Sequence, residues 1–200
     1  MTTMDSDNID GYKKELLNAR VMLKARRRLD AQEKLEKLVD DLRPRDENLL
    51  LETLITLADL LDDMGYHTDS LSRRNEAVDL SIKLFTVKHK KVADQLIARA
   101  NTTWTLLDKH EERTLILKYA NETKSSIRDA VKLLKMLPTY PNIDKVMADL
   151  RQKLTCAIMI IEANSKINGV MQSKSNLQNG GIAQSSETED QIMLDEPYAI

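Results

Sequence analysis

The sequence predicts an all-α protein built as an array of antiparallel helix hairpins. Aromatic residues make up 4% of the chain, and Gly and Pro number 5 and 4, which is a poor supply for strands and tight turns. The hydrophobic fraction of 42% still suffices for a core, and 31% charged residues suit helical surfaces. Apolar side chains recur at helical spacing through most of the chain.

Seven helical stretches follow from this spacing and from helix-breaking residues. Pro44 ends the second stretch because proline disfavours helix in the residue before it, and Gly65 ends the third because glycine accepts a positive φ. The expected ranges are 9–26, 29–42, a stretch from after Pro44 to Gly65, 68–86, 89–108, 111–136 and 142–166. They predict a helical repeat domain over residues 9–166 after a flexible N-terminus, 1–8.

Residues 167–200 differ in composition from the rest of the chain. They are rich in Gly, Ser, Asn and Gln, show no helical period, and carry more acids than bases. This composition predicts a disordered acidic tail. The last residues resemble the C-terminal ligands of PDZ domains, which makes Tyr198 and Ile200 a candidate C-terminal motif.

Small alanines repeat along the apolar stretches. Ala19 and Ala58 are 39 residues apart, and Ala58 and Ala100 are 42 apart. A small residue lets two helices approach closely, while larger neighbours fill the space to the next pair. Because one helix pair cannot bury its apolar faces alone, the repetition predicts stacked pairs.

The spacing of these residues resembles the tetratricopeptide repeat. The matching positions are Leu54, Leu57, Ala58, Leu61, Gly65, Ser70 and Ala77. The 42-residue step, with His89-Lys-Lys-Val92-Ala93 after the second helix, is similar to the longer repeats of kinesin light chains. The resemblance covers about residues 12–136 and implies a TPR-like right-handed superhelix.

Several positions depart from the family pattern. Arg74 replaces the usual aromatic residue of the second helix, and Lys90 replaces a proline. Arg99 and Thr103 stand where apolar residues are expected in the third repeat. The lysine, asparagine and arginine clamp that holds chaperone C-termini in some members is absent, so we do not expect that ligand.

In tetratricopeptide arrays the first helix of each pair lines a concave face that holds a peptide or a partner helix. Carried over by alignment, the resemblance implies a concave face lined by Arg20, Lys24, Ile55, Asp59, Asp62, Ile97, Asn101 and Trp104. Trp104 is the only tryptophan, and tryptophan is frequent at binding hot spots. A large aromatic also suits the core between helix pairs, so both interpretations of Trp104 stay open.

The densest cationic run is Lys24-Ala25-Arg26-Arg27-Arg28. We interpret it as a solvated helix end that complements the helix dipole, with an anion patch or a nucleic-acid contact as alternatives. The net charge of −2 argues against nucleic acid. The histidines lack metal-ligand spacing and no catalytic motif is present, so no metal, cofactor or enzymatic activity is expected.

We therefore expect a non-enzymatic adaptor that binds a peptide or helix of another protein. The alternative is a structural subunit that self-associates, as a homo-oligomer or within a larger assembly. The N-terminus lacks signal-peptide features, the single cysteine suits a reducing compartment, and the longest apolar run is too short to cross a bilayer. These features predict a cytoplasmic protein without membrane contact.

Overall fold

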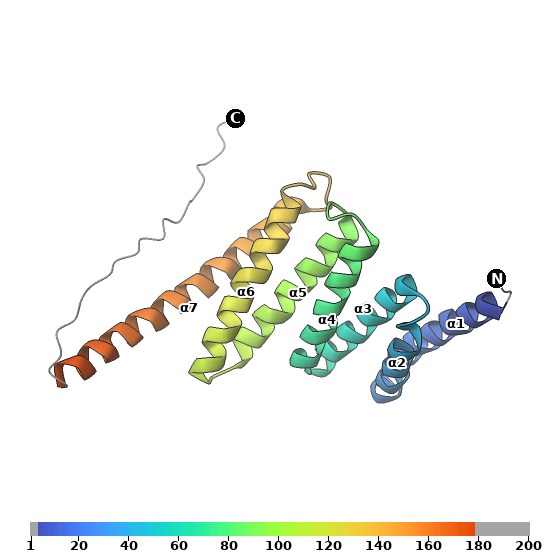
Figure 1. The fold of residues 1–200 in the computed structure, drawn as a ribbon, viewed down its shortest axis with the longest axis horizontal. Coiled ribbons are helices and arrows are strands. Elements are labelled where there is room, and N and C mark those ends of the chain that lie inside the picture. The colour runs from blue at the N-terminus through green and yellow to red at the C-terminus, as the bar shows by residue number, and fades with distance from the viewer. Residues whose placement is uncertain (1–3, 179–200) are drawn as a thin grey trace. The chain divides into compact units, whose positions relative to one another are not determined.

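The structure of the chain is a computed structural model, which describes the backbone of residues 4–178 and the side-chain surroundings of residues 9–167. Its contacts divide the chain into two compact units, Met1–Asn164 and Ser165–Ile200. The first unit holds the helical array (Figure 1). Most of the predicted tail, including Tyr198 and Ile200, lies outside the described residues.

The described residues form seven α-helices and no strand, which confirms the all-α prediction. The helices are α1 (Met4–Lys24), α2 (Arg28–Leu42), α3 (Glu47–Met64), α4 (His67–Leu84), α5 (Lys90–Lys109), α6 (Arg113–Leu134) and α7 (Ile143–Gln178). Their ends lie close to the predicted ranges except at the start of α1 and the end of α7. Helix α1 begins at Met4, inside the segment predicted to be flexible.

Helix α7 is the longest element and continues to Gln178, beyond the predicted end at residue 166. The sequence after Lys166 contains no proline before that point, and the single Gly169 weakens a helix without ending it. The regular spacing of apolar residues ends near residue 166, but helix α7 does not end there. Within the described residues, no helix combines the length and the apolar character that a membrane span requires.

Helix α3 shows how the local sequence sets the element ends. At its start the Asp46 carboxylate accepts hydrogen bonds from the backbone N–H groups of Asn48 and Leu49, at 2.9 and 3.0 Å. At its end Gly65 takes φ 86, and the N–H groups of Gly65 and Tyr66 return to carbonyls of the last turn. An acidic residue at the N-cap and a left-handed glycine after the last turn are residues that commonly mark the start and the end of a helix.

Consecutive helices pack on one another from α1 to α6, and α1 also contacts α3. The three alanines that define the repeat, Ala19, Ala58 and Ala100, are all fully buried. Ser70 on α4 donates from its hydroxyl to the Ala58 carbonyl oxygen at 3.0 Å, so α3 and α4 are in close contact at that point. The small residues therefore lie at helix–helix contacts, as predicted.

The core consists of three successive apolar clusters rather than one central mass. The first joins α1 to α4 around Leu35, Leu54 and Leu57. The second joins α4 to α7 around Ile127 and Leu150, and a third lies between α5, α6 and α7. Each cluster draws on neighbouring elements, which is the packing of a repeat array.

Candidate binding groove

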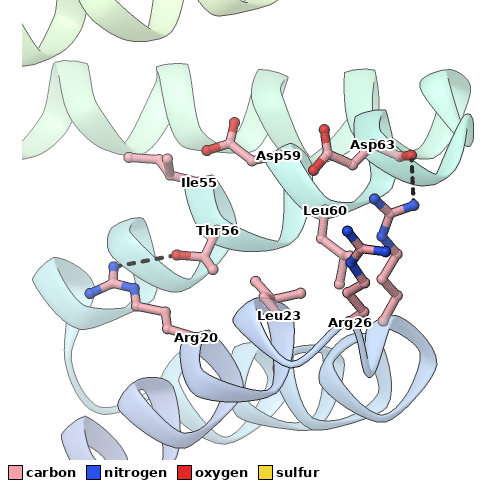
Figure 2. Close-up of a pocket in the computed structure, with 9 residues that line it drawn as sticks. Arg20, Leu23, Arg26, Ile55, Thr56, Asp59, Leu60 and Asp63 are labelled. Carbon is pink, nitrogen blue, oxygen red and sulfur yellow. Dashed lines mark hydrogen bonds between the residues drawn. The ribbon is translucent and has the colours of Figure 1, made fainter.

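A pocket of about 390 Å³ opens between α1 and α3, beside the connection from α1 to α2. Its floor is apolar, with Leu23, Ile55 and Leu60, and its rim is charged. Figure 2 shows Arg26 reaching toward α3 from the α1–α2 side, while Asp59 and Asp63 project from α3. The remaining residues that line it are Arg20, Arg28 and Thr56.

Arg26 enters this pocket through an unusual backbone conformation. Its φ is 59, in the left-handed region that non-glycine residues rarely adopt. The N–H of Arg26 bonds to the Leu23 carbonyl, and the N–H of Arg27 bonds to the Met22 carbonyl. This is a Schellman helix end, in which the left-handed position usually holds glycine.

The end of α3 is the same motif with the usual residue. The N–H of Gly65 bonds to Asp62, and the N–H of Tyr66 bonds to Leu61, at the same sequence offsets as at Arg26. Left-handed backbone costs a non-glycine residue about 1–2 kcal/mol. The chain therefore carries strain at Arg26 that glycine would remove, and that strain places an arginine side chain at the pocket.

One of the three guanidinium groups at the pocket, that of Arg26, has no partner among the residues that the structure describes. Arg20 lies 3.3 Å from the Thr56 hydroxyl and 3.5 Å from the Glu52 carboxylate, and Arg28 donates to the Asp63 backbone carbonyl at 3.4 Å. Within the described chain the Arg26 side chain makes no hydrogen bond or ion pair. Guanidinium groups suit planar anions such as carboxylates, which they bind through paired N–H donors.

A second pocket, of about 360 Å³, lies between α3 and α5. Arg74, which is buried, lies at its base and donates to Asp59 at 2.7 Å, to Asp62 at 2.9 Å and to the Thr102 hydroxyl at 3.0 Å. The Thr102 hydroxyl also donates to Asp62 at 2.9 Å. Three helices, α3, α4 and α5, thus meet at one guanidinium.

Asp62 is the acidic centre of this second pocket. Burial opposes its ionisation, but hydrogen bonds from Arg74 and His67 outweigh that effect and hold the pKa of Asp62 below its ordinary value. His67 lies between Asp62, at 3.1 Å from Nδ1, and the Lys109 ammonium, at 2.6 Å from Nε2. A neutral imidazole that donates from Nδ1 and accepts at Nε2 satisfies both contacts.

We call the two pockets together the odd-helix groove, because α1, α3 and α5 supply most of their walls. Of the residues predicted to line a concave face, Arg20, Ile55 and Asp59 line the first pocket. Asp62 and Asn101 line the second. The alignment therefore selected the helices that enclose both pockets.

The other three predicted residues lie elsewhere. Lys24 is exposed and lines neither pocket. Ile97 is half-buried and packs against the second core cluster. Trp104 is half-buried against the third cluster, which also includes Ile160 and Ile161 of α7.

Sequence reasoning missed two residues that shape the groove. Arg26 belonged to a run interpreted as a solvated helix end, although Gly65 in the matching position of the next pair could have marked it as a left-handed position. Arg74 was noted only as a departure from the family pattern. Its acidic partners, Asp59 and Asp62, were taken for groove residues free to meet a ligand, whereas both bind Arg74.

No protein-family model matches the chain, and no curated protein matches it significantly. Among solved structures, a kinesin light chain protein of Podospora anserina with nearly identical TPR-like repeats is 14% identical. That comparison covers 84% of this chain and 95% of the other, with a TM-score of 0.41. BtubC (BKLC) of P. vanneervenii is 13% identical over 98% of this chain and 100% of its own, with a TM-score of 0.39.

These two proteins are structural neighbours at low similarity. The first protein is described as having TPR-like repeats. The spacing of Leu54, Ala58 and Gly65 in this chain resembles that class of repeat. Because both TM-scores lie below 0.5, the helix-pair architecture of this chain rests on its own packing contacts. The handedness of the superhelix stays a prediction.

Proposed function

We propose that the chain is a non-enzymatic interaction scaffold that binds a segment of another protein in the odd-helix groove. An acidic side chain of the partner would lie among Arg20, Arg26 and Arg28, with apolar neighbours on Leu23 and Leu60. The strained Arg26 is the observation that carries this proposal. Strain that persists in a folded protein is typically found at ligand-binding positions, where a side chain must be held ready.

The physical basis is electrostatic and apolar together. Arg20 is paired with Glu52, and Asp59 is paired with Arg74, so the Arg26 guanidinium is the arginine of the pocket that has no partner among the described residues. A carboxylate bound by two N–H donors of one arginine gains a charge-assisted interaction stronger than a neutral hydrogen bond. The apolar floor adds burial that is not sensitive to salt.

The test is a peptide array in which single Asp or Glu residues are moved through an apolar 12-residue background. Binding of the best acidic peptide is compared in the wild-type chain, in Arg26→Gly and in Lys24→Ala. Lys24→Ala is the matched control, since it removes one exposed cation from the same run without touching the pocket. We expect Arg26→Gly to weaken binding at least tenfold while the control changes it less than threefold.

Two results would overturn the proposal. One is equal binding of acidic peptides and their amide counterparts by the wild-type chain. The other is an equal loss of affinity in Arg26→Gly and Lys24→Ala, because that would show attraction by net charge rather than a formed site.

Self-association is the second candidate function, and exposed apolar side chains on α1 and α2 favour it. Leu17, Val21 and Leu29 are 60%, 56% and 70% exposed. Leu17 and Val21 lie one helical turn apart on one face of α1. Exposed apolar side chains that are neighbours on one helix face are typical of a surface that another protein covers.

Light scattering after size exclusion tests this second candidate. A dimer that forms with increasing concentration should be lost in Leu17→Glu and kept in Met159→Glu, which changes an equally exposed apolar residue of α7. A monomer at every concentration, or an equal effect of both substitutions, would reject self-association through α1.

A further inference from the structure

The first residue of α4, His67, lies between the ends of two other helices. Its side chain is only 10% exposed. Nδ1 lies 3.1 Å from the Asp62 carboxylate in the last turn of α3, and Nε2 lies 2.6 Å from the Lys109 ammonium at the end of α5. His67 also lines the second pocket of the odd-helix groove. One imidazole ring therefore connects α3, α4 and α5 at the edge of a candidate binding pocket.

The two contacts fix where the proton of the ring lies. An ammonium group has donors only, and an ionised carboxylate has acceptors only. Nε2 must therefore accept from Lys109, and Nδ1 must carry the hydrogen that is donated to Asp62. Only the neutral ring protonated at Nδ1 meets both conditions, because both nitrogens of an imidazolium are donors.

Acidic side chains near His67 favour its protonation. Asp62 is in direct contact with the ring, and Asp63 of α3 lines the same pocket. On α4 itself, Asp69 lies in the first turn of the helix. An adjacent negative charge stabilises the charged form of a histidine, so a proton added at Nε2 leaves the contact with Asp62 intact.

Positive groups oppose that protonation. The Lys109 ammonium faces Nε2 at 2.6 Å. Arg74 of α4 binds the Asp62 carboxylate at 2.9 Å and so reduces the negative charge that His67 meets. His67 also lies at the N-terminus of α4, where the helix dipole disfavours a cation. The repulsion is greatest at Lys109, because that group contacts the atom that takes the proton.

Lys109 is the group that can move away. It lies in the last turn of α5, is exposed, and has a flexible four-carbon side chain. Asp62 is instead held by Arg74 and by the Thr102 hydroxyl. Protonation of His67 therefore ends its contact with Lys109, while the hydrogen bond from Arg74 to Thr102 still joins α4 to α5.

We propose that His67 is a pH-sensitive switch at the second pocket of the odd-helix groove. Histidine ordinarily changes charge between about pH 5 and 8. At the upper end of that range the neutral ring holds Lys109 against the start of α4. At the lower end the ring is charged, Lys109 is released, and the pocket gains a positive charge that favours acidic segments of a partner. This last consequence rests on the proposed binding function, whereas the switch itself does not.

The switch is tested by NMR on the full chain with nitrogen-15-labelled histidine. His67→Gln identifies the signals of His67. At pH 8 we expect His67 to carry its proton on Nδ1. We expect His89 to carry its proton on Nε2, because its Nδ1 accepts a hydrogen bond from the Lys91 backbone N–H at 3.2 Å. His89 is thus an internal control with the opposite tautomer.

A lysine substitution shows whether Lys109 opposes the charge on His67. Lys109→Met should raise the midpoint of the His67 titration by about 0.5 pH unit, the size expected for one exposed charge pair. Lys90→Met is the matched control and should change the midpoint much less, because Lys90 is an exposed lysine at the opposite end of α5. In the wild-type chain the backbone amide signal of Lys109 should move with the same midpoint, and His67→Gln should abolish that movement.

Two NMR results contradict the switch. One is a proton on Nε2 of His67 at pH 8. The other is an equal effect of Lys109→Met and Lys90→Met on the His67 midpoint, because that would show a response to net charge rather than to the contact.

Binding of the best acidic peptide is then compared at pH 8 and pH 6. Asp63 lines both pockets, so the site at Arg26 adjoins the pocket at His67. We expect the wild-type chain to bind at least threefold more tightly at pH 6, and His67→Gln to show no such gain. Arg26→Gly should bind more weakly at both pH values and keep the ratio. Equal pH dependence in the wild-type chain and His67→Gln would show that His67 does not control binding.

The outcome is separable from that of the proposed function. If no acidic peptide binds at either pH, the proposed function is wrong, and the tautomer and the titration midpoints still decide the switch.

Discussion

Two residues in the same backbone position illustrate how the chain uses its helix ends. Gly65 and Arg26 occupy the left-handed position of equivalent Schellman ends, with φ of 86 and 59. A Cβ added at Gly65 would meet no atom within 4 Å, so the only cost of a side chain there is the backbone conformation. A substitution at Gly65 therefore measures the free-energy cost of left-handed backbone without a contribution from steric clash.

We expect Gly65→Ala to lower the free energy of unfolding by about 1 kcal/mol, and Arg26→Gly to raise it by a similar amount. The two substitutions apply the same backbone argument in opposite directions. Urea denaturation followed by circular dichroism measures both. If Arg26→Gly proves less stable than the wild-type chain, the Arg26 side chain must make stabilising contacts, and the strain argument fails.

At the scale of elements, the fully buried alanines decide how closely paired helices approach. Ala58 lies where Ser70 of α4 bonds to the α3 backbone, so the two helices are in direct contact there. A larger side chain at such a point forces the helices apart or into strained rotamers.

Ala58→Leu should therefore destabilise the fold by about 1–3 kcal/mol, because the extra atoms overfill the α3–α4 contact. Ala148→Leu is the control, since Ala148 is an exposed residue of α7 where surface changes usually stay within about 0.5 kcal/mol. Thermal unfolding of both variants compares them directly. Equal stabilities would show that Ala58 is not needed for close approach.

The network around Arg74 connects α3, α4 and α5 and makes their packing depend on pH. Asp62 has a pKa in the folded state below that of an unfolded aspartate, which is about 3.9. Its ionised form is therefore favoured by folding. That contribution is fully present above the unfolded pKa and is lost as pH falls through the folded pKa.

We expect Asp62→Asn to reduce stability at pH 7, since charge-assisted hydrogen bonds to Arg74 are weakened. The difference from the wild-type chain should shrink as pH falls below about 4, where Asp62 itself becomes protonated. Stability measured by denaturation between pH 2.5 and 7 tests this. Asp63→Asn serves as the control and should leave stability at pH 7 close to that of the wild-type chain, because the Asp63 carboxylate makes no ion pair with a described residue.

At the scale of the whole molecule, the first unit ends inside α7. Leu150 and Ala157 of α7 are buried in the second and third clusters, so the N-terminal part of this helix completes the core. The contact unit ends at Asn164, near the predicted domain end at residue 166. We propose that residues 1–164 suffice for folding.

A chain that ends at Asn164 should unfold in one transition close to that of the full chain. A chain that ends at Asn142 loses α7 and exposes the surfaces around Leu134 and Tyr119, so it should unfold at a much lower temperature. Differential scanning calorimetry of the three chains makes the comparison. A large loss of stability on removing residues 165–200 would contradict the proposed boundary.

The sequence predicted the helices that line the odd-helix groove, but it did not predict all of the residues that shape it. Alignment of the small alanines identified the helices that supply the groove, and with them Arg20, Ile55 and Asp59 of the first pocket. It did not identify Arg26, whose importance depends on a backbone angle. It also treated Asp62 as available for a ligand, whereas Arg74, His67 and Thr102 already surround it.

The sequence by itself determined the helices, their ends and the small residues at their contacts. These features depend on neighbours within a few residues: the apolar period, the Asp46 cap and the freedom of Gly65. Tertiary structure alone decided which charges are neutralised and which remain available. Arg74 meets Asp59 and Thr102 from positions 15 and 28 residues away, and Arg99 meets Asp129 from 30 away. Local sequence cannot specify such distant partners, because they are set by how the helices stack.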